Sequence, residues 1–201
     1  MLNDYINENY LKETKIKELH LEFNKNKNFP NLVLKDFFNN KVISRIEKEI
    51  RTEKFTKQES DLFSFSQTED LLNTDNKILK KFYKFLNSKE FKEYVLKITK
   101  IKAFGKIDAS AFIYAKNEYL LPHDDRLEKR KIAYVINLSK EFTNEDGGSL
   151  DFFEGKRIIK SILPSFNTLT IFKVIENKTF HQVSEVLTNK ERISIAGWFN
   201  K

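Results

Sequence analysis

Apolar residues recur at intervals of three and four in four segments of the first hundred residues. These segments are residues 2–22, 42–50, 78–86 and 89–98. This spacing puts the apolar side chains on one face of a helix, although the pattern is weakest in the first segment. Ser88 stands just before the last segment, where its hydroxyl is suited to cap a helix N-terminus. The N-terminal half is therefore predicted to be mainly helical.

After residue 100 the pattern changes to short, largely apolar runs separated by turn sequences. The predicted strands are Ala109–Ala115, Ile132–Leu138, Ser149–Phe153, Arg157–Leu163, Thr168–Phe172, Phe180–Val183 and Arg192–Phe199. Glycines at 147, 148 and 155 mark the turns between them, since glycine readily adopts a positive φ. Seven or eight short strands at this spacing predict a β-sandwich or jelly roll. We expect an α+β, mainly β fold, with the helices packed against the β-core.

One segment, Glu53–Asp70, fits neither pattern. It is polar and rich in Ser and Gln, with Phe55, Leu62, Phe63 and Phe65 as its apolar anchors. We predict a long loop or hairpin, and a lid over a binding site is the function that such a segment suits.

Composition narrows the class of protein. The chain has 201 residues and no cysteine, so disulfides, thiolate zinc sites and cysteine nucleophiles are excluded. No apolar run approaches the roughly 20 residues of a membrane-spanning helix, and the N-terminus does not resemble a signal peptide. We expect one cytoplasmic domain over residues 1–201, with a helical support and lid in 1–100 and the β-core in 101–201. The net charge of +7 comes mainly from Lys mixed with Glu and Asp, so direct nucleic-acid binding is not expected.

Two of the three histidines lie in the β-rich half. His123 precedes Asp124 and Asp125 at the exit of a predicted strand, and His181 lies 58 residues later in another strand. An H-x-D pair with a distant histidine is the two-histidine, one-carboxylate set that binds non-haem Fe(II). Alternation along a strand would let His123 and Asp125 reach one ion. The alternative makes His181 a core histidine and Asp125 a turn residue. His20, in a charged helical segment, is expected on the surface.

Arg192 opens the final predicted strand, eleven residues after His181 and beside apolar neighbours. A guanidinium in that setting is costly unless it meets an anion, so one interpretation is a clamp on the carboxylate of a co-substrate. The alternative is a surface cation at a strand end. The Tyr114 hydroxyl, on the strand before the H-x-D pair, is suited to the same carboxylate, although taken alone this tyrosine, one of seven, is more typical of core packing.

These residues resemble the 2-oxoglutarate- and Fe(II)-dependent dioxygenases of prolyl hydroxylase type. The similarity is greatest to the catalytic domain of the eukaryotic ribosomal prolyl 3-hydroxylases. The stretches that carry it are Glu59–Phe63 with Gln67–Thr68, Leu120–Arg126, Gly147–Leu150, Ile162–Asn167, and Phe180–Val186 with Arg192–Phe199. Together they reach across most of the chain. The metal-binding motif is common to the superfamily, whereas the stretches around residues 61–68 and 181–186 are more specific.

The resemblance implies a double-stranded β-helix, that is, a jelly-roll core with supporting N-terminal helices. It implies Fe(II) held by His123, Asp125 and His181, with 2-oxoglutarate bound by Arg192 and Tyr114. Dioxygen would be consumed, succinate and CO2 released, and ascorbate would serve as reductant. The eukaryotic proteins carry a second jelly-roll domain, whereas this sequence ends at Lys201. We therefore expect a single-domain version.

Three functions stay open at this stage. The first is hydroxylation of a prolyl residue in a protein, with a ribosomal or translation protein as the partner. In that case the 53–70 segment would cover the substrate, and Trp198 would line the pocket or belong to the core. The second is hydroxylation of a small molecule or free amino acid. The third is a non-catalytic binding domain on the same fold.

Overall fold

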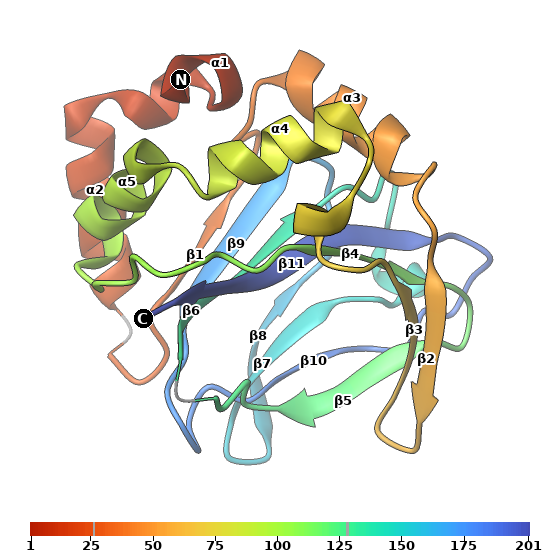
Figure 1. Ribbon diagram of the computed structural model, residues 1–201. Helices are drawn as coiled ribbons and strands as arrows, with labels where there is room; N and C mark the ends of the chain where they lie inside the picture. Colours follow the sequence, from red (N-terminus) through yellow and green to blue (C-terminus); the bar gives the residue numbers. More distant parts are fainter. Residues whose placement is uncertain (26, 128) are drawn as a thin grey trace.

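The structure is a computed structural model and describes residues 1–25, 27–127 and 129–201 (Figure 1). Its helices are α1 (Leu2–Tyr5), α2 (Glu13–Lys25), α3 (Asn40–Ile50), α4 (Lys77–Leu86) and α5 (Lys89–Thr99), with short 3-10 turns at Glu8–Leu11, Leu71–Asn73 and Asn144–Asp146. The strands are β1 (Asn31–Leu34), β2 (Thr56–Ser60), β3 (Phe63–Gln67), β4 (Ser110–Tyr114), β5 (Tyr119–His123), β6 (Arg130–Asn137), β7 (Leu150–Glu154), β8 (Arg157–Ile162), β9 (Thr168–Lys173), β10 (His181–Val183) and β11 (Arg192–Asn200).

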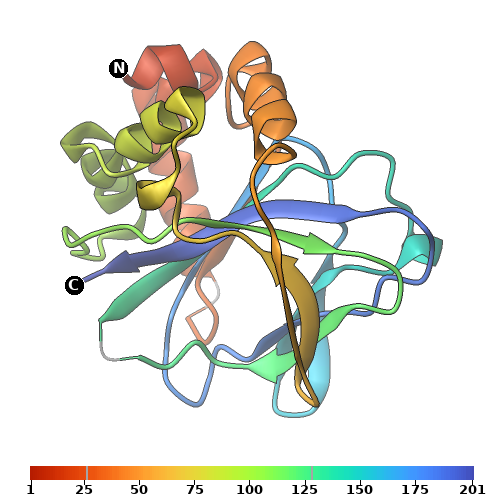
Figure 2. The ribbon, with the colours of Figure 1, turned by 45° about the vertical axis from the view of Figure 1, so that its right-hand side comes forward.

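All eleven strands belong to one antiparallel sheet. Its order is β1-β9-β6-β11-β4-β3-β5-β10-β7-β8, and β2 pairs with β3 alone. The sheet curls on itself, and the helices gather against one side of it (Figures 1 and 2). This curled, mainly β arrangement is a jelly roll, so the predicted fold class is confirmed.

Alternation along β11 shows how the sheet separates the core from a pocket. Ile193 and Ile195 point toward the helices and join the main apolar core. Arg192, Ser194 and Trp198 point to the other face and line a pocket inside the curl. Successive side chains of a strand point to opposite faces, so one strand serves both purposes. The helices therefore support the outer face of the sheet, and the inner face is left for chemistry.

The first hundred residues contribute more to the sheet than the sequence indicated. β1 pairs with β9 at one end of the sheet. The Glu53–Asp70 segment contains the expected hairpin, but its second strand also joins β4 to β5 within the sheet. This strand is therefore part of the core. The boundary expected at residue 100 separates helices from strands only in part.

The predicted helix over residues 2–22 is divided into α1, a 3-10 turn and α2. Ile6 forms a β-bridge with Phe38, and the Asn7 side chain accepts a hydrogen bond from the Asn9 amide, so the chain leaves the helical path there. The prediction for His20 was wrong. It is half-buried, and its Nδ1 lies 2.8 Å from the carbonyl oxygen of Ile98 on α5.

Ser88 caps α5, accepting a hydrogen bond from the Phe91 amide as predicted. Among the described residues, none of the helices combines the length and apolar character needed to cross a bilayer.

Candidate active site

Two cross-strand pairs position the site on the inner face of the sheet. His181 on β10 stands directly opposite His123 on β5, and Arg192 on β11 stands directly opposite Tyr114 on β4. Directly opposed residues of an antiparallel pair point to the same face. β3 lies between β4 and β5. All four side chains line a pocket of about 300 Å³.

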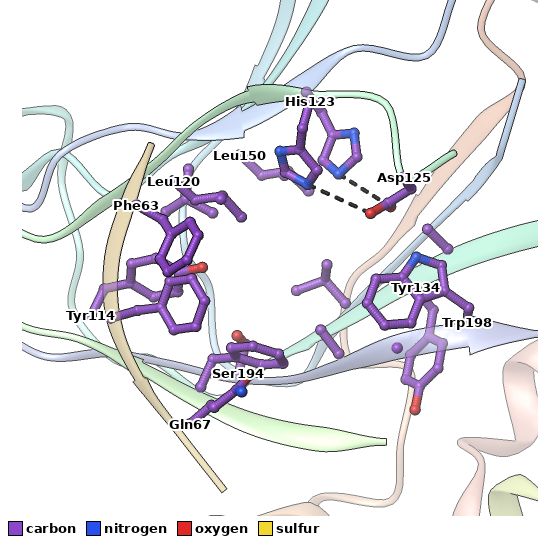
Figure 3. A pocket seen from close by; sticks show the side chains of 18 of the residues that line it. Phe63, Gln67, Tyr114, Leu120, His123, Asp125, Tyr134, Leu150, Ser194 and Trp198 are labelled. Carbon is purple, nitrogen blue, oxygen red and sulfur yellow. Dashed lines mark ion pairs between the residues drawn. The ribbon is translucent and has the colours of Figure 1, made fainter. Parts of the chain in front are cut away.

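One end of the pocket holds the predicted metal ligands. His123, Asp125 and His181 each offer one ligand atom, and these atoms lie within 4.8 Å of one another. The Asp125 carboxylate is 3.5 Å from Nε2 of His123 and 3.4 Å from Nε2 of His181. Figure 3 shows His123 and Asp125 directed toward each other, with Tyr114 and Ser194 on the opposite side of the pocket. Two imidazoles and one carboxylate in this arrangement suit a divalent transition metal.

The hydrogen bonds of the two imidazoles fix which nitrogen faces the carboxylate. Nδ1 of His123 lies 3.0 Å from the Leu121 carbonyl oxygen, and Nδ1 of His181 lies 3.0 Å from the Thr179 carbonyl oxygen. A carbonyl oxygen only accepts, so each Nδ1 donates its proton. In the neutral imidazole the lone pair then resides on Nε2, as metal ligation requires.

Asp125 reaches the site by a different route from the one expected. β5 ends at His123, and Asp125 lies beyond it with a φ of 55°. This left-handed conformation is one that aspartate tolerates better than most residues. The left-handed backbone of Asp125, beyond the strand end, therefore places the carboxylate, and simple strand alternation does not apply. Asp124 is also buried, and its side chain accepts hydrogen bonds from Arg126 and from the Asn177 amide.

The pKa shifts of Asp125 and His181 favour metal binding at neutral pH, whereas the Asp125 carboxylate raises the pKa of His123 against the effect of burial. Burial alone would raise the pKa of Asp125, but its contact with His123 and the proximity of both imidazoles lower it to about 2. Trp198 makes a smaller contribution to this lowering. Burial lowers the pKa of His181 to about 4. The site therefore offers an ionised carboxylate and a neutral His181.

Comparison with known proteins assigns the family. Residues 109–200 match the family model described as the 2OG-Fe(II) oxygenase superfamily. The chain is 34% identical to prolyl 3-hydroxylase OGFOD1 of Xenopus laevis over 180 residues, which make up 86% of this chain and 35% of that protein. The chain belongs to the 2OG-Fe(II) oxygenase superfamily. Fe(II), 2-oxoglutarate and dioxygen are the cofactors that this membership implies.

Other relatives and solved structures agree with this assignment. Prolyl 3,4-dihydroxylase OGFOD1 of Ostreococcus tauri is 33% identical over 196 residues, covering 86% of this chain and 38% of that protein. This oxygenase chain thus spans little more than a third of the length of these relatives. A Pseudomonas putida prolyl-4-hydroxylase structure has the same fold, with a TM-score of 0.74 at 15% identity over 91% of this chain and 98% of that one.

The other end of the oxygenase pocket contains a buried cation. Arg192 is 2% exposed, and its Nε donates to the Gly148 carbonyl oxygen at 2.8 Å. Among the described residues it has no carboxylate partner. Its Cζ lies 5.1 Å from the centre of the Tyr114 ring, and burial raises the pKa of Tyr114 to about 12. An unpaired, buried guanidinium beside a protonated phenol is suited to bind an anion.

A glycine turn holds Arg192 in place. Gly147 and Gly148 have φ values of 67° and 68°, and a Cβ on Gly147 would lie 2.0 Å from the Glu185 carbonyl oxygen. Only glycine meets both demands at position 147. The buried Asp146 anchors the turn, since its carboxylate accepts hydrogen bonds from Thr143 and from Lys190 at 2.8 Å.

We expect Asp146→Asn to lower thermal stability by a few degrees at pH 7. Hydrogen bonds from Lys190, Thr143 and Thr188 hold the pKa of Asp146 well below its usual range. A lowered folded-state pKa contributes stability above the ordinary carboxyl pKa, and this contribution disappears as the pH falls through the folded-state value. The difference from the parent protein should therefore shrink in melting curves recorded toward pH 2. Asp61→Asn, at an exposed hairpin position, is the control. A difference that is the same at every pH would contradict this account.

The sequence did not single out Arg130, which also lines the pocket. Its guanidinium lies 3.3 Å from the centre of the Trp198 ring and 3.6 Å from the Asp125 carboxylate. It belongs to a run of charged residues that resembles any exposed loop. Trp198, for which two interpretations stood open, does line the pocket.

Proposed function

We propose that this protein is an Fe(II)- and 2-oxoglutarate-dependent hydroxylase that acts on a prolyl residue of a protein. His123, Asp125 and His181 would hold the metal, and Arg192 with Tyr114 would bind the far carboxylate of 2-oxoglutarate. The observation that carries the proposal is the convergence of three ligand atoms within 4.8 Å in the same pocket as a buried guanidinium without a carboxylate partner among the described residues. Relatives named prolyl hydroxylases support the choice of substrate.

Each residue has a definite task in this proposal. Bound Fe(II) and 2-oxoglutarate supply the oxidising chemistry, in which dioxygen is consumed and succinate and CO2 are released. The two imidazoles present Nε2, and Asp125 stays ionised at neutral pH. Apolar side chains that line the pocket keep it poor in water, which strengthens the electrostatic contacts within it.

Two exposed leucines next in sequence to pocket-lining residues support a protein substrate. Leu62, at the hairpin turn, is 63% exposed, and the neighbouring Leu121 is 41% exposed. The Leu121 amide donates to the Leu62 carbonyl oxygen at 2.9 Å, so the two positions are adjacent. The next residues, Phe63 and Leu120, line the pocket itself. Exposed apolar side chains beside a pocket are typical of an interaction surface. A related structure contains a prolyl hydroxylase with a peptide fragment bound.

The test of this function is mass spectrometry of proteins from cells with and without the gene. We expect the mass of one oxygen atom to be added to a proline only where the gene is present. Proteins of the translation machinery are the first to examine, because the sequence resembles the ribosomal prolyl hydroxylases. A gain of oxygen on a metabolite alone would favour the small-molecule hydroxylase, and no gain anywhere would favour the binding domain. A cytoplasmic location, ascorbate as reductant and the single-domain organisation stay predictions.

Replacing Leu62 with serine should impair hydroxylation of the protein substrate more than turnover of 2-oxoglutarate without substrate. Loss of one apolar contact of about 1.4 kcal/mol corresponds to a tenfold higher KM for the substrate. The measurement uses the hydroxylated protein identified above, with succinate release recorded in its absence. Leu72→Ser, at another partly exposed leucine, is the matched control. Equal losses in both assays would argue against a substrate contact at the hairpin.

A further inference from the structure

Behind the proposed metal site lies a carboxylate that has no part in the chemistry described so far. Asp151 on β7 is only 3% exposed. Its Oδ1 accepts hydrogen bonds from Ser149 at 2.7 Å and Ser161 at 2.5 Å, and its Oδ2 accepts one from Nε2 of Gln182 at 2.9 Å. Within the described chain no lysine or arginine pairs with it. Burying a carboxylate without a cation costs free energy, and the three hydrogen bonds are what offset this cost.

The register of β10 shows what these bonds hold. Gln182 stands opposite Asp151, and its neighbour His181 stands opposite Phe152. By alternation, Gln182 points away from the pocket while His181 points into it. The hydrogen bond from Gln182 to Asp151 therefore fixes β10 from behind, at the residue next to the proposed ligand.

β10 needs such support because it is short. It consists of His181–Val183, and its pairing with β5 shifts register within those three residues. On the side of β10 that faces β7, the Ser149 and Ser184 hydroxyls lie 2.9 Å apart, and the Ser149 amide donates to the Ser184 hydroxyl at 2.9 Å. The polar network around Asp151 therefore ties β10 to β7 where the backbone ladder to β5 is irregular.

We propose that Asp151 is a positioning residue for the metal site, acting through Gln182 to direct Nε2 of His181. The inference rests on the assignment of His181 as a ligand in the proposed function. The network has a second arm, from Asp151 to Ser161 on β8, and β8 carries none of the proposed ligands. Both hydrogen bonds end on the same carboxylate, but only the one from Gln182 leads to a proposed ligand. Removing each bond in turn therefore distinguishes positioning of the metal ligand from stabilisation of the sheet.

The experiment compares Gln182→Met with Ser161→Ala in the full chain. Each variant removes one hydrogen bond to Asp151. Affinity is measured by titration with Co(II), whose visible spectrum reports on its ligand geometry. We expect Gln182→Met to bind Co(II) about tenfold more weakly, with an altered spectrum, because release of β10 would misdirect Nε2 of His181 and loss of ligand orientation costs about 10-fold or more in affinity. Ser161→Ala should bind Co(II) like the parent protein, even if its melting temperature falls.

A pair of exchanged residues provides the rescue. Gln182→Glu alone places a second carboxylate opposite that of Asp151. Their repulsion should weaken Co(II) binding. In the double variant with Asp151→Asn, the amide at position 151 can donate to the carboxylate at position 182. The hydrogen bond between β7 and β10 is then restored with donor and acceptor exchanged, and most of the Co(II) affinity should be recovered. Equal Co(II) affinity in Gln182→Met and Ser161→Ala would overturn the inference and leave Asp151 a purely structural group. If His181→Ala also leaves Co(II) binding unchanged, it is the ligand assignment that fails.

Discussion

Replacing His181 with alanine should abolish tight metal binding and 2-oxoglutarate turnover while the chain stays folded. The imidazole is buried, its Nδ1 is committed to the Thr179 carbonyl oxygen, and its Nε2 faces Asp125 at 3.4 Å. Loss of an outer hydrogen-bond partner costs about 10- to 100-fold in metal affinity, so loss of a ligand should cost more. Isothermal titration with Mn(II) and succinate release measure the two effects, and circular dichroism checks the fold.

His20→Ala is the matched control for this substitution. His20 is partly buried and, like His181, bonded through Nδ1 to a backbone carbonyl, but it lies on α2, faces α5 and does not line the pocket. It should lose some stability and retain full Mn(II) affinity. Full turnover in His181→Ala would refute the ligand assignment, and loss of Mn(II) binding in both variants would point to general destabilisation.

The fold was largely predictable because the apolar residues of most helices and strands recur at the spacing typical of that element. The seven predicted strands and the three helices after residue 40 are confirmed to within a few residues. For local reasons β1 was missed, and β5 was expected only as a strand that ends near His123, without bounds. β1 has only four residues and follows Pro30, and β5 contains Pro122, which argues against a strand in a sequence-based assignment. β2 is mostly exposed, so it has no apolar alternation to detect.

The site was predictable in its residue types but not in its geometry. The H-x-D pair, the distant histidine and the arginine can be recognised from the chemistry they would perform. Their convergence depends on strand register, such as His181 opposite His123, which no local pattern encodes. Asp151 was not recognised for the same reason, since its partners on β8 and β10 come together only in the folded sheet. The ligand roles stay predictions until the substitutions above are made.

Substitution of Arg192 by methionine should raise the KM for 2-oxoglutarate by about 100-fold, since loss of one member of a buried charge pair costs about 3 kcal/mol. Arg192→Lys should have a KM for 2-oxoglutarate between those of the parent protein and Arg192→Met, because an ammonium keeps the charge but cannot form the two parallel hydrogen bonds of a planar guanidinium. The parent guanidinium is buried, burial lowers its pKa, and its side chain bonds only to the Gly148 carbonyl and the Ser194 hydroxyl among the described residues.

This setting also predicts how stability responds to the anion. A buried cation without a counter-charge destabilises the fold, so Arg192→Met should melt at or above the melting temperature of the parent protein when no co-substrate is present. With Mn(II) added, 2-oxoglutarate should raise the melting temperature of the parent protein and leave that of the variant nearly unchanged, because a ligand stabilises only the state that binds it. Arg45→Met, on the exposed face of α3, should behave like the parent protein. An unchanged KM for 2-oxoglutarate in Arg192→Met would show that the carboxylate is held elsewhere.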